Sequence, residues 1–175
     1  MKYVALLRGI NVGGNNMIKM ETLRSTFESL GFENVTSYIN SGNLSFEASA
    51  ADDAVLAKKI HDAIQSEFEF DISVMVRSST EIDEIIANNP YIGQFESDKD
   101  MHVFFLASEL SSDQTKSLLE KNSEEEMIAV NGRTIYYLLK MSIIDSVLGK
   151  GFIDKKIKVP ATARNWRTVK KLAEM

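Results

Sequence analysis

The first stretch of the sequence that could do chemistry is a glycine-rich segment near the N-terminus, which reads LLRGINVGGNNMIKM. Glycines allow backbone N–H groups to close on an anion, and Arg8 and Lys19 bracket the segment with positive charge. The spacing matches neither the dinucleotide-binding fingerprint nor the phosphate-binding loop of nucleoside triphosphatases. Two interpretations therefore stay open: a cradle for an anion, or a tight turn whose Asn side chains bond to the backbone.

The second candidate segment is TARNWRTVKKL, close to the C-terminus. Thr162 is predicted to cap the start of a helix, and Trp166 is predicted to anchor that helix on the protein. Arg164, Arg167 and Lys171 share one side of this predicted helix. That basic side could contact a phosphate group, or it could only keep the end of the chain soluble.

The remaining residue types give no catalytic or metal site. The chain contains no cysteine, which removes disulfides, thiolate nucleophiles and Cys-based zinc sites. His61 is expected to face solvent and His102 to open a strand, and neither has partners at metal-ligand spacing. The sequence therefore names no catalytic residue, no metal ligand and no cofactor, and no reaction is predicted.

Composition and charge narrow the class of partner. The chain has 175 residues and a net charge of −5, with Lys and Arg concentrated after residue 149. An acidic balance disfavours nucleic acid as a partner, and the acidic run at 124–126 is expected to form a solvated loop. The apolar run at 3–7 is too short for a signal peptide or a membrane span, so a cytoplasmic protein with no membrane partner is expected.

The elements that must position these residues follow from hydrophobic periodicity. In the first half, apolar residues predict strands at 3–7, 35–39, 44–46 and 72–76, and helices at 20–30 and 56–68. The sequence NSGN, at 40–43, predicts the turn of a hairpin. The resulting order, β-α-β-β-α-β, is that of the ferredoxin-like fold.

The second half begins the same order again. Ser78 and Glu81 predict a capped helix that ends before Pro90, and residues 91–100 read as a linker. A strand at 103–106, a helix after Ser111 and a hairpin at Asn131-Gly132 follow. A helical region at 143–157 precedes the C-terminal helix.

Three segments together resemble a known family. LLRGINVGGNNMIKM, YINSGNLSF and TARNWRTVKKL, in this order and at this separation, resemble the bacterial family called domain of unknown function 1697. The resemblance covers essentially the whole chain and implies two ferredoxin-like subdomains, but no activity. The family pattern near the C-terminus reads Thr-Thr-Arg-Asn-Trp-Asn-Thr, and this chain has Ala163 and Arg167 at its second and sixth places. The resemblance also favours one site built from the glycine-rich segment, the NSGN turn and the Arg-Asn-Trp segment.

The sequence thus predicts an α+β protein of two ferredoxin-like subdomains packed together. The expected N-terminal subdomain is 1–77, the helix and linker 78–100, and the C-terminal subdomain, with its basic terminal helix, 101–175. The predicted ligand-binding residues are Arg8, Gly9, Asn11, Gly13, Gly14, Asn15, Lys19, Ser41, Asn43, Arg164 and Asn165.

The predicted function is binding of a small anionic ligand, phosphate-bearing or a nucleotide, by a monomer or weak homodimer. Single-stranded nucleic-acid binding is the first alternative, because the RNA recognition motif has the same element order. That motif stacks bases on exposed aromatic side chains, and the first and third strands offer only Tyr3 and Phe46. The second alternative is a protein interaction module without catalysis.

Overall fold

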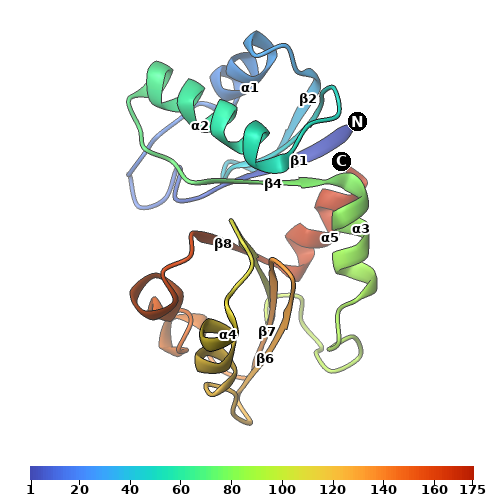
Figure 1. Ribbon diagram of the computed structural model, residues 1–175, viewed down its shortest axis with the longest axis vertical. Helices are drawn as coiled ribbons and strands as arrows, with labels where there is room; N and C mark the ends of the chain where they lie inside the picture. The colour runs from blue at the N-terminus through green and yellow to red at the C-terminus, as the bar shows by residue number, and fades with distance from the viewer. The chain divides into compact units, whose positions relative to one another are not determined.

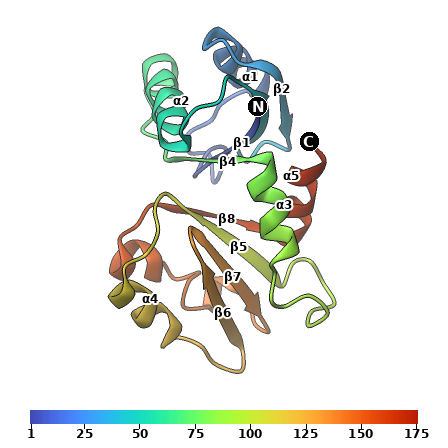
Figure 2. The ribbon, with the colours of Figure 1, turned by 45° about the vertical axis from the view of Figure 1, so that its right-hand side comes forward.

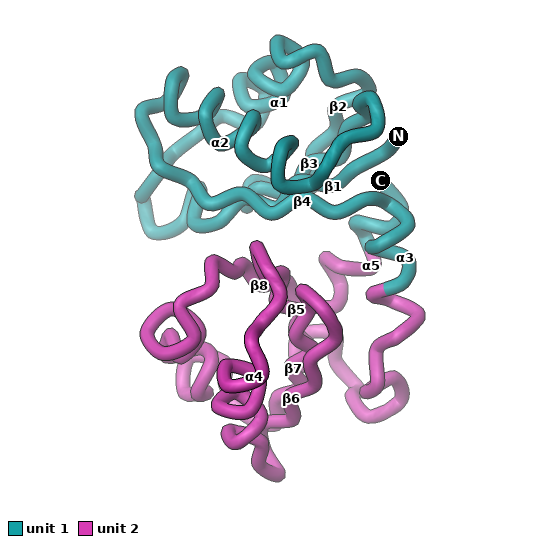
Figure 3. Tube along the Cα trace, in the orientation of Figure 1, with its two compact units in different colours: residues 1–84, 171–175 teal, residues 85–170 magenta.

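The chain folds into two compact units. The computed structural model describes residues 1–175, of which unit 1 comprises 1–84 and 171–175 and unit 2 comprises 85–170 (Figure 3). Helices α3 (Ser79–Ala87) and α5 (Trp166–Glu174) each contain residues of both units. The change from unit 1 to unit 2 at residue 85 falls inside the segment 78–100, which the sequence placed between the subdomains.

Unit 1 has the ferredoxin-like order. Its elements are β1 (Lys2–Leu7), α1 (Met20–Ser29), β2 (Glu33–Tyr38), β3 (Asn43–Glu47), α2 (Asp53–Phe68) and β4 (Val74–Ser78). The sheet order is β2-β3-β1-β4, and every neighbouring pair is antiparallel. The predicted fold of this half is confirmed.

The core of unit 1 lies between the sheet and its two helices. Helices α1 and α2 lie on the same face of the sheet (Figure 1). Alternate residues of β1 share one buried cluster with Phe27 of α1 and Ile60 of α2. Tyr3 stacks on Phe46 inside this cluster, with ring centroids 5.7 Å apart. Burial of these side chains therefore fixes the position of β1, from whose end the glycine-rich segment leaves.

Unit 2 contains a four-stranded antiparallel sheet with the same strand topology as the sheet of unit 1. Its elements are β5 (Met101–Leu106), α4 (Ser112–Leu119), β6 (Glu126–Asn131), β7 (Thr134–Leu139), a 3-10 turn (Ile143–Asp145), a π-helical turn (Ile153–Ile157) and β8 (Ala161–Asn165). The sheet order is β6-β7-β5-β8, and Figure 2 shows β5 between β7 and β8. Ser111 and Gln114 form the predicted capping box at the start of α4. The second predicted ferredoxin-like subdomain is confirmed.

The segment after Pro160 differs from its prediction. Instead of starting a helix at Thr162, it forms strand β8, which pairs antiparallel with β5. Helical spacing in a short segment is a weak signal, and pairing with a neighbouring strand overrides it. The helix starts at Trp166, and Asn165 caps it by accepting a hydrogen bond from the Thr168 N–H at 3.0 Å. Arg164 therefore does not share a helix face with Arg167 and Lys171.

The predicted anchoring role of Trp166 is confirmed. Its side chain is 3% exposed, and its indole lies edge-on to the ring of Phe95, with centroids 6.3 Å apart. The indole therefore packs the start of α5 into unit 2.

The prediction that residues 124–126 form a solvated loop is wrong for Glu126. Glu126 is the first residue of β6, and its buried carboxylate accepts hydrogen bonds from the Tyr137 hydroxyl and, at 2.7 Å, from the Val147 N–H. Burial is the larger cause of a raised pKa of the Tyr137 hydroxyl, and the hydrogen bond to Glu126 raises this pKa further. The hydrogen bond from the Val147 N–H attaches the segment after β7 to the sheet, and the Glu126 carboxylate is buried at this contact.

The turn between β2 and β3 lies close to the end of β1. Gly42 has φ of 90°, and its carbonyl accepts a hydrogen bond from the Leu7 N–H at 2.8 Å. A Cβ at this position would lie 2.7 Å from the Leu7 Cβ and 3.1 Å from the Leu7 carbonyl oxygen. Only glycine satisfies both the backbone conformation and the space.

We expect Gly42→Ala to lower the free energy of unfolding by about 2–5 kcal/mol, the sum of left-handed strain and overpacking. Gly31→Ala is the matched control, because Gly31 has φ of 86° and nothing within 4 Å of its added Cβ. It should cost only the strain, about 1–2 kcal/mol. Urea unfolding of both variants measures the difference, and equal losses would contradict the close approach.

Candidate functional site

The glycine-rich segment folds as a small hairpin between β1 and α1. The Asn15 N–H donates to the Val12 carbonyl at 3.0 Å, and Gly13 and Gly14 between them have φ of 59° and 77°. The Asn11 N–H donates to the Asn16 carbonyl at 3.2 Å and closes the base of the hairpin. Positive φ at both central residues is the signature of a tight primed turn, which explains the Gly-Gly pair.

The side chain of Asn11 joins this hairpin to two other elements. Its Oδ1 accepts a hydrogen bond from the Ile18 N–H at 2.7 Å, and its Nδ2 donates to the Ile18 carbonyl at 3.0 Å. Nδ2 also donates to the Asn40 carbonyl, in the β2–β3 turn, at 2.7 Å. Asn11 itself has φ of 54°, a conformation that asparagine tolerates. Residues 8–19 and 39–43, called here the N-terminal ledge, are thereby tied together.

Other Asn side chains of the ledge also bond to the backbone. Asn16 donates to the Gly9 carbonyl at 3.1 Å. Asn43 is fully buried and donates to the Tyr38 carbonyl at 3.3 Å and to the Ser41 hydroxyl at 3.1 Å. The segment is therefore a tight turn whose Asn side chains bond to the backbone, as one of the two interpretations predicted. Hydrogen bonds from its own Asn side chains hold much of the ledge together.

The ledge carries donors and positive charge on its surface. Gly13 and Gly14 are exposed at the tip of the hairpin, and Lys19 is exposed at the N-cap of α1. No side chain caps the first-turn N–H groups of α1. Arg8 is half-buried, and its backbone N–H donates to the Ser73 carbonyl at 3.0 Å, which fixes the start of the ledge beside the start of β4.

Two of the predicted site residues lie in unit 2. The Arg164 guanidinium donates from Nη1 to the Thr162 hydroxyl at 2.7 Å and to the Ala163 carbonyl at 2.9 Å. Burial lowers the pKa of Arg164 to about 10, so the group still carries its charge at neutral pH. Asn165 caps α5. That these two residues share a site with the ledge stays a prediction.

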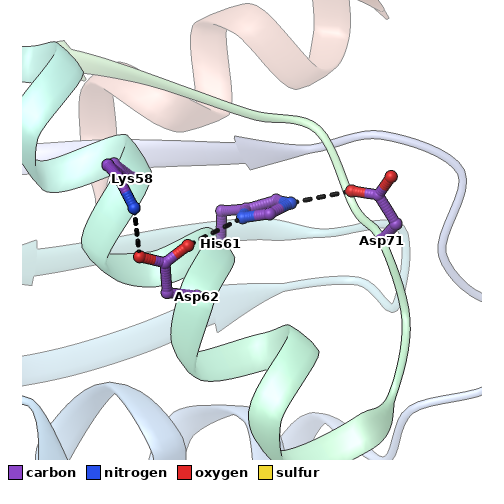
Figure 4. A network of polar contacts seen from close by, with 4 residues as sticks. All are labelled: Lys58, His61, Asp62 and Asp71. Atoms are coloured by element: carbon purple, nitrogen blue, oxygen red, sulfur yellow. Dashed lines mark hydrogen bonds and ion pairs between the residues drawn. The ribbon is translucent and has the colours of Figure 1, made fainter.

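A second polar cluster of unit 1 was missed by the sequence analysis. Nε2 of His61, on α2, lies 2.7 Å from Oδ1 of Asp71, and Nδ1 lies 3.1 Å from Oδ1 of Asp62 (Figure 4). Lys58 contacts the other oxygen of Asp62 at 2.5 Å. The pKa of His61 is raised, mainly by the hydrogen bond to Asp71 and to a smaller extent by the hydrogen bond to Asp62.

This cluster lacks the parts of a catalytic site. Both ring nitrogens of His61 face carboxylates, so neither is directed at a nucleophile. Only the protonated ring can donate from both nitrogens at once, so the cluster favours imidazolium. No group of three or more His, Cys, Asp or Glu side chains is arranged to hold a metal ion. None of the helices is long and apolar enough to span a membrane.

The fold and the ledge define a class of protein: two ferredoxin-like α+β subdomains, the first with a glycine-rich loop after its first strand. Comparison with family models identifies the family. Residues 1–136 match the model described as "Protein of unknown function (DUF1697)", and the chain belongs to this family.

A solved structure shares the fold over nearly the whole chain. It is the conserved bacterial protein SP0830 from Streptococcus pneumoniae, 27% identical in sequence, with a TM-score of 0.79. The alignment covers 99% of this chain and 97% of that one. No curated protein matches the chain significantly.

The His61 cluster predicts a pH dependence of stability. A pKa raised in the folded state stabilises the protein fully below the unfolded pKa of about 6.5, and this stabilisation is lost as pH rises through the folded value. The difference in free energy of unfolding between wild type and His61→Gln should therefore be largest near pH about 5.5 and shrink by pH about 8.

Asp71→Asn is the control for this titration, because it removes the first cause of the shift while leaving the imidazole. Urea unfolding across this pH range should show a weaker dependence in Asp71→Asn than in wild type. His102, whose pKa is lowered by burial, is common to all three proteins and cancels in the comparison. A difference that grows toward pH 8 would contradict the assignment.

Proposed function

We propose that the N-terminal ledge binds a small anionic ligand that carries a phosphate group. The observation that carries the proposal is the Asn11 side chain, which ties the glycine hairpin, Ile18 just before α1 and the β2–β3 turn with three hydrogen bonds. A site held rigid before binding loses little conformational entropy when the ligand arrives. The ledge therefore meets the first requirement of a recognition site, which is preorganisation.

Charge and backbone donors support the same proposal. Between Arg8 and Lys19 the segment contains no acidic residue. The first-turn N–H groups of α1 have no side-chain cap, and the positive end of a helix dipole favours an anion. Glu21, in that first turn, is the nearest acid in the sequence and opposes binding. The ligand is therefore expected to bind through its phosphate oxygens.

Burial of Tyr3 and Phe46 counts against the alternative of single-stranded nucleic-acid binding. Tyr3 and Phe46 are 2% and 0% exposed and stack on each other in the core, so neither can stack on a base. Binding of a small ligand is the better-supported function.

Other parts of the proposal rest on the sequence. They are the participation of Arg164 and Asn165, a monomeric or weakly dimeric state and a cytoplasmic location, which the absence of cysteine suits.

Titration calorimetry with inorganic phosphate and pyrophosphate at low salt tests the proposal. Arg8→Ala should weaken binding by roughly 10–100-fold, the range for losing a hydrogen bond to a charged group. Arg24→Ala is the matched control: Arg24 is a cation of α1 that donates to the Ser37 hydroxyl at 2.7 Å, outside the ledge. It should keep wild-type affinity.

Glu21→Gln tests the sign of the electrostatic argument. Removing this acid should tighten phosphate binding about 2–5-fold, because a charge in the first helical turn contributes about 0.3–1 kcal/mol. Equal affinities of wild type and Arg8→Ala would contradict the proposal, and so would the absence of any binding at millimolar phosphate.

A further inference from the structure

Three exposed apolar side chains belong to residues that are next in sequence to groups of the Asn11 hydrogen bonds. Val12, Met17 and Ile39 are 59%, 61% and 54% exposed. Val12 follows Asn11 directly. Met17 follows Asn16, whose carbonyl accepts from the Asn11 N–H, and Ile39 precedes Asn40, whose carbonyl accepts from the Asn11 side chain. Each apolar residue is thus one position away from a group that takes part in an Asn11 contact.

Ile39 adopts an unfavourable backbone conformation at this place. Its φ is 49°, in the left-handed region, where a β-branched residue is a genuine outlier. Asparagine or glycine would fit this φ better, and the exposed side chain adds nothing to the core. Backbone strain of this kind is concentrated at active sites, ligand-binding sites and switch regions.

The ledge that contains these apolar residues also contains charged and polar groups. A small-molecule site combines apolar walls with a few placed polar groups that fix the orientation of the ligand. In a site on the ledge, Arg8, Lys19 and the backbone of the exposed Gly13-Gly14 pair would supply the polar part, and the three apolar side chains would supply the wall. Methionine sulfur also makes favourable contacts with aromatic rings.

We infer that the ligand of the ledge is a mononucleotide, whose base lies on Val12, Met17 and Ile39 while its phosphate meets the basic groups. This inference rests on the proposed phosphate site and narrows the class of phosphate-bearing ligand that it binds. A sugar phosphate has no apolar group to cover the three side chains. An anionic lipid surface would engage a broader amphipathic face than three side chains on a rigid turn.

Calorimetric titrations with AMP, ribose 5-phosphate and inorganic phosphate test the inference. AMP should bind about tenfold or more tightly than ribose 5-phosphate, because its base removes apolar surface from water. Met17→Gln and Val12→Ser should reduce this advantage several-fold and leave the affinity for inorganic phosphate unchanged. Both side chains are exposed, so neither substitution removes core packing.

Val55→Ser is the matched control, because Val55 lies on α2 of the same unit and is 61% exposed. It should change neither affinity. Equal binding of AMP and ribose 5-phosphate would overturn the inference while leaving the phosphate site intact, and failure of every phosphate compound to bind would overturn both. Binding to vesicles of phosphatidylglycerol and phosphatidylcholine that Met17→Gln abolishes would overturn it in favour of a lipid surface.

Discussion

The geometry of the N-terminal ledge depends on one amide side chain. The carboxamide of Asn11 bonds both to Ile18, just before α1, and to the β2–β3 turn, using its oxygen as an acceptor and its nitrogen as a double donor. No aliphatic side chain could replace it, and aspartate would lose both donated bonds. Gly42 completes the constraint, because its close approach to Leu7 holds the turn against the end of β1.

The two ferredoxin-like units share a topology but differ in how the helix after the first strand begins. The loop after β5 is short, and Ser111 and Gln114 form a capping box, so backbone N–H groups at the start of α4 are hydrogen-bonded by side chains. The loop after β1 is longer, and Lys19, the N-cap residue of α1, makes no side-chain capping hydrogen bond. The N-terminus of this helix is thus capped by side chains in unit 2 but not in unit 1, where the ledge is proposed to bind its ligand.

Local sequence signals predicted most of the fold, and long-range contacts account for what they missed. Periodicity and turn residues predicted both β-α-β-β orders. β8 was missed because its partner β5 lies some 60 residues earlier, and no local pattern records that pairing. Burial of Glu126 depends on the Val147 N–H, and the His61 cluster depends on Asp71 across a loop. For the site, the sequence identified the glycines and asparagines of the ledge, but not which backbone groups Asn11 joins.

Amide hydrogen exchange of Asn11→Gly tests the central claim most directly. Glycine accepts the φ of 54° at this position, so the substitution removes the side-chain hydrogen bonds without adding backbone strain. If Asn11 holds the ledge together, the Ile18 N–H, which donates to its Oδ1 in the wild type, should lose protection, and the Phe46 N–H in the core should keep it. Unchanged protection at Ile18 would contradict the account, because the ledge would then be held by other contacts.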